Sequence, residues 1–447
     1  ADIFKRAVSV TGATAADKTY DGTLTTTVSG GSLAGVDLDG DGAVDTATGK
    51  LSGDSITLEA SGAVGTFADK NVNWVITYAD DGTTEVSRAA GDKDLTVSGY
   101  TLSGDDAANY YIEQPTGLAA TINPAALTVA GITIETREYD GTTDATIVTD
   151  SSTYSGLVTG DDVVVSATGS FGSANAGTQT VNLTSTYAGA DVDNYDITDQ
   201  ASASGVITQR ELDISGVLAE DKVYDGTVTA SFDFSGVDLV AAGLVVGTNG
   251  TADDLTIASI AGDFDTKNVG GDKVVTFTIT GQGADLGNYT FGGQTTTTAN
   301  ITPKLISISN SSVADKDYDG NANAAVTVGN VFVGLVGSET VTIADAVGTF
   351  AGKDVVLAPE FDADGNATNN FVAAEQAVTI NYTLADGSNG GLASNYMIAD
   401  EQQLAVINQA DLTITANNIK KVITELDPTL TVRSDGFVAG ENLADLT

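Results

Sequence analysis

An acidic stretch near the start of the chain, "DLDGDGAVD" at residues 37–45, has the spacing of a calcium-binding loop. Aspartates occupy its positions 1, 3, 5 and 9, a glycine stands at position 6, and the carbonyl of position 7 is a further candidate ligand. The predicted ligands are Asp37, Asp39, Asp41, Ala43 and Asp45. Calcium takes about six to eight oxygen ligands, which alternate carboxylates can bring to one point. Thr48 stands where an EF-hand has its glutamate, so a short loop inserted into a β-protein is expected, with an acidic solvated hairpin as the alternative.

A weaker metal candidate lies in the stretch "DADGN" and consists of Asp362, Asp364 and Asn366. Only three oxygen-bearing side chains alternate there. Asp, Gly and Asn are also the residues that favour tight turns. The sequence therefore favours a turn at this place.

Enzymatic activity is not expected, because the chain has no histidine and no cysteine. Ser-His-Asp and Cys-His catalytic groups and the usual zinc hydrolase sites cannot be built without them. The absence of cysteine also excludes disulfides. Paired carboxylates remain, but among 61 acidic residues some pairs at glycosidase separations arise by chance.

The net charge of −43 excludes a nucleic acid partner, because the phosphate backbone would be repelled. A hydrophobic content of 41% is enough to build folded domains. No stretch approaches the roughly 20 apolar residues that span a bilayer. The start "ADIFKRAVSV" lacks the apolar core of a signal peptide, so the targeting signal of an exported protein is expected outside these residues.

Three short phrases recur in a fixed order along the chain. The first is Tyr-Asp-Gly, as in "DKTYDG". The second is an apolar phrase around a phenylalanine, as in "GTFADKNV", and the third is Asn-Tyr followed by an apolar strand. The residues of these phrases are Tyr20, Asp21, Gly22, Tyr139, Asp140, Gly141, Tyr224, Asp225, Gly226, Tyr318, Asp319 and Gly320; Phe67, Phe171, Phe264 and Phe350; and Asn109, Tyr110, Asn194, Tyr195, Asn288, Tyr289, Asn395 and Tyr396.

The closing phrases predict four repeats and an incomplete fifth. The predicted ranges are residues 1–124, 125–209, 210–303, 304–409 and 410–447. The first of these carries the acidic stretch, which would account for its greater length. Connections such as "NPA" and "TPK" contain proline and no Gly/Ser linker, so neighbouring repeats are expected to form a semi-rigid rod, each with its own apolar interior. The incomplete fifth range suggests a segment of a longer array.

Within a repeat, runs such as "ALTVAGITIE" and "DVVVSATGSF" alternate apolar and polar residues and favour Val, Ile and Thr. This pattern is typical of half-buried strands. About six strands per repeat predict an all-β, elongated tandem array of small immunoglobulin-like β-sandwiches. A β-grasp sheet is the second choice, because no helical stripe is available to cover it.

The tyrosines of the Tyr-Asp-Gly phrase are predicted to be buried anchors whose hydroxyls find backbone partners, beside a tight Asp-Gly turn. A row of exposed, ligand-stacking tyrosines is the alternative. The preceding lysines, Lys18, Lys222 and Lys316, could form a covalent crosslink to the asparagine of the closing phrase, but salt bridges to nearby aspartates are favoured. Arg137 stands at this position in the second repeat and cannot form the crosslink.

Together the phrases "KTYDGT", "REYDGT", "KVYDGT" and "KDYDGN" resemble the YDG-type repeats of large bacterial surface adhesins, and residues 410–447 resemble the related MBG repeat. The resemblance implies an exported protein at the bacterial cell surface, in which such repeats act as a stalk that contacts its neighbours in the same chain. A self-assembling filament or surface layer, and direct binding of a glycan or host surface, are the alternatives. The resemblance implies no active site.

Overall fold

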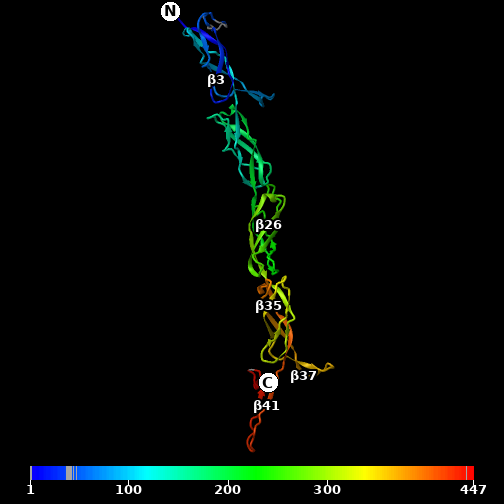
Figure 1. Cartoon of the computed structure of the whole chain (residues 1–447). Coiled ribbons are helices and arrows are strands. Elements are labelled where there is room, and N and C mark those ends of the chain that lie inside the picture. Colours follow the sequence, from blue (N-terminus) through cyan, green and yellow to red (C-terminus); the bar gives the residue numbers. More distant parts are fainter. Residues whose placement is uncertain (1–2, 37–42, 44, 47, 439, 447) are drawn as a thin grey trace. The chain divides into compact units, whose positions relative to one another are not determined.

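The computed structural model describes residues 3–36, 43, 45–46, 48–438 and 440–446. This part of the chain consists of β-strands, turns and three-residue 3-10 turns, and it contains no α-helix (Figure 1). The prediction of an all-β array of small sandwiches is therefore confirmed, and a β-grasp sheet lacks the helix it would need. In the same residues no helix is long and apolar enough to cross a membrane.

Contacts between residues divide the chain into two compact units. The first contains residues 1–210, 245–250 and 287–289, and the second contains the remainder. The finer boundaries drawn from the sequence stay predictions. Their ranges serve below as names, from the first repeat (1–124) to the fifth segment (410–447).

The second repeat shows the arrangement most simply. Its opening strand lies between two partners, antiparallel to the strand before the central hairpin and parallel to the strand of the Asn-Tyr phrase. A four-stranded sheet of order β14-β20-β18-β17 faces it, and a short β13-β15 pair lies beside them. The elements are β12 (Ala125–Ala130), β13 (Thr133–Ile134), β14 (Arg137–Glu138), β15 (Ile147–Val148), β16 (Thr153–Ser155), β17 (Val164–Phe171), β18 (Gly177–Ala188), η2 (Val192–Asn194), β19 (Tyr195–Thr198) and β20 (Ser202–Thr208).

The sequence alternation explains why these strands form. In β12, Leu127 and Val129 are 0% and 1% exposed, while the alternate residues Ala126, Thr128 and Ala130 face solvent. Val165 of β17 lies in the same buried cluster as Leu127. Burial of one face of each strand is what makes a two-sheet sandwich stable.

The other repeats keep this order with local changes. In the first repeat the main strands merge into one sheet of order β10-β1-β3-β5-β8-β11-β2. Its elements are β1 (Arg6–Ala15), β2 (Lys18–Thr19), β3 (Thr25–Ala34), β4 (Thr57–Glu59), β5 (Val64–Phe67), β6 (Trp74–Tyr78), β7 (Glu85–Ala90), β8 (Asp92–Ser98), β9 (Thr101–Ser103), η1 (Ala107–Asn109), β10 (Tyr110–Glu113) and β11 (Ala119–Asn123). The third repeat contains β21 (Arg210–Ile214), β22 (Leu218–Ala219), β23 (Lys222–Val223), β24 (Phe232–Asp233), β25 (Thr256–Phe264), β26 (Gly270–Gln282), η3 (Leu286–Asn288), β27 (Tyr289–Gly293) and β28 (Thr296–Thr302).

The fourth repeat pairs its opening strand in the order β34-β29-β39 and has a five-stranded sheet of order β31-β40-β38-β35-β32. Its elements are β29 (Lys304–Ser309), β30 (Ser312–Val313), β31 (Lys316–Asp317), β32 (Asn323–Ala324), β33 (Val326–Thr327), β34 (Val331–Val333), β35 (Val341–Phe350), β36 (Leu357–Phe361), β37 (Ala367–Ala373), β38 (Glu375–Asp386), η4 (Ala393–Asn395), β39 (Tyr396–Ile398) and β40 (Glu401–Asn408). The fifth segment contains β41 (Thr413–Ala416), β42 (Val432–Asp435) and η5 (Leu443–Asp445).

The first and fourth repeats carry an inserted hairpin that the second and third lack. In the first repeat it is the β6-β7 pair, and in the fourth it is the β36-β37 pair, which leaves the body of its repeat (Figure 1). The acidic stretch therefore does not account alone for the length of the first repeat, because part of the extra chain forms β6 and β7.

Buried residues continue from the first repeat into the second. A single cluster joins Phe67 and Ile122 of the first repeat to Leu127 of the second, through the contact of Tyr20 with Tyr195. The prediction of a fully separate interior for each repeat is wrong at this point, because residues of the Tyr-Asp-Gly and Asn-Tyr phrases pack against each other across the boundary between the two repeats.

Candidate functional site: the joint between repeats

Each Tyr-Asp-Gly phrase forms a loop that its own charged residues hold in place. The Asp21 carboxylate accepts a hydrogen bond from the Thr23 N–H at 2.9 Å, and Gly22 takes a positive φ of 75°. Lys18 contacts the same carboxylate at 2.5 Å. Burial alone raises the pKa of Asp21, but the hydrogen bonds from Lys18 and Thr23 lower it to about 2. The loop is thus a rigid, ionised turn.

The other three phrases repeat this turn. Lys222 and Lys316 contact Asp225 and Asp319 at 2.8 and 2.5 Å. Arg137 contacts Asp140 in the same way. The lysines therefore form the salt bridges that the sequence favours, rather than lying on the closing-phrase asparagine as a crosslink requires.

In the first three phrases the tyrosine packs against the tyrosine of an Asn-Tyr phrase in the following repeat. The rings of Tyr20 and Tyr195 meet edge to face, with centroids 5.5 Å apart. Tyr139 and Tyr289, and Tyr224 and Tyr396, do the same at 5.4 and 5.5 Å. Tyr20, Tyr139 and Tyr224 are 1–3% exposed, so they do not form an exposed stacking row. Tyr318 is only partly buried.

We call this contact a joint and number the joints along the chain. Joints 1 to 3 are defined by the two tyrosines and by the residues at two further positions, and joint 4 by Tyr318 and the same two positions. The first position lies three residues after the phenylalanine of the second phrase. The second position lies three residues after a valine of the following repeat, which is Val158, Val245, Val336 or Val438. The four joints are joint 1 (Tyr20, Lys70, Asp161 and Tyr195), joint 2 (Tyr139, Ala174, Thr248 and Tyr289), joint 3 (Tyr224, Lys267, Glu339 and Tyr396) and joint 4 (Tyr318, Lys353 and Glu441).

A carboxylate lies at the centre of joint 1. The hydroxyls of Tyr20 and Tyr195 donate to Asp161 Oδ2 at 2.7 and 2.6 Å, and Lys70 Nζ lies 2.7 Å from Oδ1. The prediction of a backbone partner for the Tyr20 hydroxyl is therefore wrong. The side chain of Asp161 is 3% exposed. Burial raises its pKa, but the hydrogen bonds from Lys70 and the two tyrosines outweigh burial and lower it below its ordinary value.

Joint 3 repeats joint 1 with a glutamate. Tyr224 and Tyr396 donate to the two oxygens of Glu339 at 2.8 and 2.6 Å, and Lys267 donates to Oε1 at 2.7 Å. Burial, and then the hydrogen bond to Glu339, raise the pKa of Tyr396 to about 12. The carboxylate is thus held as an anion between neutral phenols and one ammonium group.

Joint 2 keeps the tyrosine pair but replaces both charged residues. Ala174 stands where the lysine is, and Thr248 stands where the carboxylate is. The two charges are lost together, so no buried charge is left without its counterion. A buried charge without a partner is costly, and this explains why the pair changes as a unit.

An asparagine closes joints 1 to 3 from the side of the following repeat. Its Oδ1 accepts a backbone N–H of the preceding repeat: Val72 to Asn194 at 2.9 Å, Ala176 to Asn288 at 2.8 Å and Val269 to Asn395 at 3.0 Å. These three asparagines are 0–3% exposed. In every repeat the asparagine ends a 3-10 turn and the tyrosine begins the next strand, which fixes their directions.

The phenylalanines of the second phrase lie under the joints. Phe67, Phe171, Phe264 and Phe350 are 1–3% exposed. Cations of the Tyr-Asp-Gly loops lie over three of these rings, such as Lys222 over Phe264 at 5.7 Å. The second phrase therefore connects the loop to the apolar interior of its own repeat.

The glycine of each phrase receives a valine from the following repeat. A Cβ at Gly226, where φ is 80°, would lie 2.6 Å from Val336 Cγ1. Gly22, Gly141 and Gly320 have the same relation to Val158, Val245 and Val438, at 2.9–3.1 Å. Only a residue without a Cβ satisfies both the backbone and the contact.

Replacement of Gly226 by alanine is expected to weaken joint 3 by about 2–4 kcal/mol, since strain at positive φ and overpacking each cost roughly 1–2 kcal/mol. The control is Gly365→Ala, where φ is also 80° but no atom lies within 4 Å of the added Cβ. Amide exchange at Val269, which donates to Asn395 across the joint, measures the effect. Equal effects of both substitutions on Val269 exchange would show that the valine contact is unimportant.

The valine of each joint, and the acid or Thr248 three residues after it, come from a phrase that the sequence analysis did not identify. It reads "GLVTGD", "GLVVGT", "GLVGSE" and "GFVAGE" in the later repeats and "GKLSGD" in the first. Its recurrence in fixed order was a usable signal. The acidic residues of this phrase did not stand out in the sequence, because the chain has 61 acidic residues.

The predicted metal ligands have different outcomes. In the acidic stretch, residues 37–42 lie outside the described residues, so calcium binding there stays a prediction. In "DADGN", the Asp362 carboxylate accepts the N–H groups of Asp364 and Asn366 at 3.0 and 2.8 Å. This is the turn between β36 and β37. Within the described ranges, no three acidic side chains cluster as metal ligands do.

Comparison with known proteins gives a match to one family model and likenesses to solved structures. No curated protein matches the chain. Among solved structures, the chain is similar to Drosophila N-cadherin EC1-4, with 10% identity over 81% of this chain and 94% of that chain, at a TM-score of 0.16. Residues 123–203 and 208–299 match the model of the YDG domain, so the chain contains YDG-type repeats.

Proposed function

We propose that the chain is a non-catalytic spacer of an exported bacterial surface adhesin, which holds a distal binding region away from the cell. The joints carry this proposal. Within each compact unit, a single residue separates the closing strand of one repeat from the opening strand of the next, at Pro124 in the first unit and Pro303 in the second. A connection of this length, combined with a buried joint, allows little independent movement of neighbouring repeats.

The chemistry of the joints supports a mechanical role. Bending joint 1 or joint 3 would separate a buried carboxylate from its three donors. Restoring water to such groups does not compensate fully, so the closed joint is favoured. A binding or catalytic site would instead leave polar groups open to a ligand.

Solution scattering of the full chain at several concentrations tests the proposal. A compact globule of 447 residues would have a radius of gyration of about 22 Å, and a spacer must exceed this clearly at every concentration. A value near 22 Å would overturn the proposal, and growth with concentration would favour the filament. The same experiment with calcium or chelator tests the acidic stretch. If Asp37, Asp39, Asp41 and Asp45 bind calcium and stiffen the chain, chelation should change the curve.

Lowering the pH is expected to open joint 1. Because the folded pKa of Asp161 lies below its ordinary value of 3.8, its stabilising effect is present above that value and is lost as the pH falls further. The single tryptophan reports this joint, since Trp74 Nε1 donates to the Asp193 carbonyl at 2.7 Å across it. Trp74 emission should shift to longer wavelength as the pH falls below about 4.

Two controls separate this effect from general acid unfolding. Asp161→Asn should remove the joint-specific part of the transition. The Ala176 amide of joint 2, where Thr248 replaces the acid, should keep its protection factor over the same range. Simultaneous loss of protection at Val72 and Ala176 would argue against titration of Asp161.

A further inference from the structure

The inserted hairpin of the first repeat lengthens a connection that the third repeat keeps short. The third repeat reads "KNVGGDK" at residues 267–273. The first repeat has the same "KNV" at residues 70–72 and the same "GDK" at residues 91–93. Residues 73–90, which contain β6 and β7, therefore stand where the third repeat has Gly270 alone.

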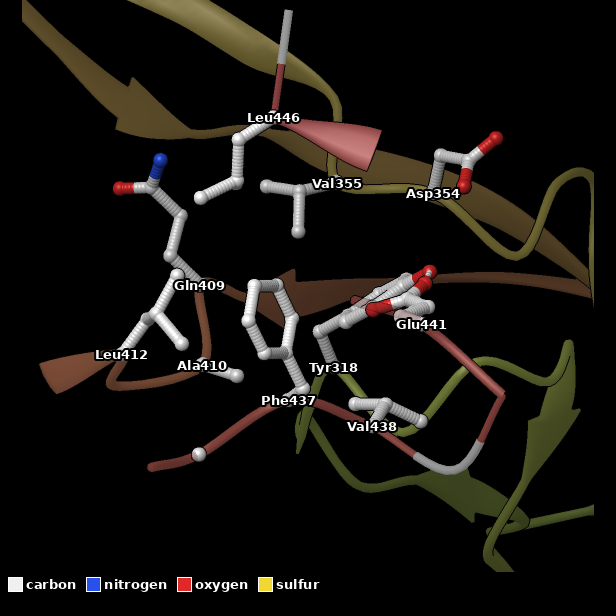
Figure 2. A pocket seen from close by; sticks show the side chains of 11 residues that line it. Tyr318, Asp354, Val355, Gln409, Ala410, Leu412, Phe437, Val438, Glu441 and Leu446 are labelled. Carbon is white, nitrogen blue, oxygen red and sulfur yellow. Dashed lines mark hydrogen bonds between the residues drawn. The ribbon is translucent and has the colours of Figure 1, made fainter. Parts of the chain in front are cut away.

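Both inserted hairpins leave their repeat beside a joint. Trp74 begins β6 two residues after Val72, whose N–H crosses joint 1. Leu357 begins β36 two residues after Val355. Figure 2 shows Val355 at a hollow of about 300 Å³ that Tyr318 of joint 4 also lines. Insertion at these places puts the base of a hairpin next to a contact between repeats.

The base of the first hairpin is held in place by its own bonds. Trp74 pairs with Ala90 across the β6-β7 ladder, and the Gly91 N–H donates to the Asn73 carbonyl at 2.7 Å. Alternate residues of a strand share one face, so Arg88 lies diagonally opposite Trp74 on the face that Ala90 shares. The guanidinium carbon of Arg88 lies 4.3 Å from the centre of the indole ring. Trp74 and Arg88 thus form one stacked pair.

This pair holds a single residue of the second repeat, Asp193. The Trp74 Nε1 donates to the Asp193 carbonyl at 2.7 Å, and the Arg88 guanidinium lies 3.6 Å from the Asp193 carboxylate. Asp193 lies in η2, and the next residue, Asn194, accepts the Val72 N–H at 2.9 Å. The first repeat therefore holds this 3-10 turn twice, once at joint 1 and once through the hairpin.

The rest of the hairpin takes little part in this contact. A hollow of about 360 Å³, lined by Trp74, Arg88 and Pro124 among others, lies between the base of the hairpin and the connection to the second repeat. Tyr78 and Val86, farther along the hairpin, are 51% and 65% exposed. The polar contacts of Trp74 and Arg88 are therefore what joins the hairpin to the second repeat.

We propose that the inserted hairpin is a brace for joint 1, which keeps this joint closed more of the time. Opening the joint must separate Trp74 and Arg88 from Asp193, in addition to breaking the contacts around Asp161. One hydrogen bond of the Trp74 kind changes an equilibrium about fivefold, and the exposed ion pair adds less. The brace does not depend on the spacer function, because it concerns the closure of one joint in any setting.

Replacing residues 73–90 by a single glycine in the full chain tests the brace. This chimera gives the first repeat the "KNVGGDK" connection of the third. The protection of the Val72 amide from exchange should fall by about 5- to 50-fold, the combined effect of the lost contacts. The Val269 amide of joint 3, which follows a repeat without the insertion, should keep its protection. The chimera is also the chain in which joints 1 and 2 are compared without the brace.

Point substitutions test the same contact while the hairpin stays in place. Trp74→Phe keeps an aromatic ring and removes the N–H, so Val72 protection should fall by about 3- to 10-fold. The matched control is Glu85→Ala, which removes a carboxylate 3.9 Å from Arg88 Nε within the hairpin itself. This control should leave Val72 protection unchanged.

Two outcomes would overturn the proposal. Val72 protection equal to that of the parent chain, in the chimera or in Trp74→Phe, would show that the hairpin touches the second repeat without holding it. Equal losses at Val72 and Val269 in the chimera would show a general loosening of the chain, because joint 3 has no such hairpin beside it.

Discussion

Replacing Asp161 by threonine is expected to open joint 1, and adding Lys70→Ala to this variant is expected to cost less than Lys70→Ala costs in the parent chain. The double substitution gives joint 1 the residues of joint 2, where Ala174 and Thr248 occupy these positions. Either single substitution leaves buried polar or charged groups without one of their partners. Without the acid, two tyrosine hydroxyls lose their acceptor and the Lys70 ammonium loses one of its two carboxylate partners, and without Lys70 the carboxylate is buried without a cation.

Each single change should cost about 3–5 kcal/mol, the usual loss when one partner of a buried ion pair is removed. Asp161→Thr belongs at the lower end, because Lys70 is 33% exposed and keeps its contact with Asp191 at 2.8 Å. The double variant should lose less than the sum of the two, with a coupling of about 1–3 kcal/mol.

The measurement is the local opening free energy, because a chain of several repeats does not unfold in one step. Amide exchange at Val72, which donates to Asn194 across the joint, supplies it, and Trp74 emission gives a second probe. The matched control is the exposed pair Lys421 and Asp427, for which the same cycle should give a coupling below about 1 kcal/mol. Additive effects at joint 1 would contradict the explanation given for joint 2.

Local patterns in the sequence were sufficient for the strands and for the burial of the tyrosines. Alternation in a stretch such as 125–130 predicts a strand, and a tyrosine beside Asp-Gly predicts an anchor at a turn. The partners of that tyrosine could not be predicted in this way, because Tyr20 and Asp161 are 141 residues apart. Nothing local to either residue indicates that they meet.

The joint is nevertheless detectable in the sequence, as a pattern of recurring phrases. Four phrases recur in order, and a set of phrases that always occurs together suggests parts of one contact. Joint 2 gives the strongest hint, since Ala174 and Thr248 depart from the pattern in two different repeats but in the same joint. Comparing repeats by joint, rather than by unit, reveals this paired change. The inserted hairpins, in contrast, have no counterpart in neighbouring repeats and could be found only from the structure.

Replacement of Tyr195 by alanine is expected to weaken joint 1 by about 3–5 kcal/mol, as for other large aromatic side chains removed from a core. Tyr195 is 1% exposed, packs edge to face on Tyr20 and bonds to both Asp161 and the Val158 N–H at 2.6 and 2.9 Å. Tyr195→Phe keeps the ring and removes only the hydroxyl, so it should cost about 1–3 kcal/mol.

The ratio of these two losses shows what the joint depends on. If packing of the rings dominates, Tyr195→Phe stays close to the parent chain in Val72 exchange, and joint 2 should be about as strong as joint 1. If the bonds to the carboxylate dominate, phenylalanine should behave almost like alanine, and joint 2 should open first on heating. Tyr78→Ala, at a position 51% exposed on the inserted hairpin of the same repeat, should leave Val72 exchange unchanged. A loss below about 1 kcal/mol for Tyr195→Ala would mean that the tyrosine pair does not hold the repeats together, because removal of a buried aromatic side chain from a working contact cannot cost so little.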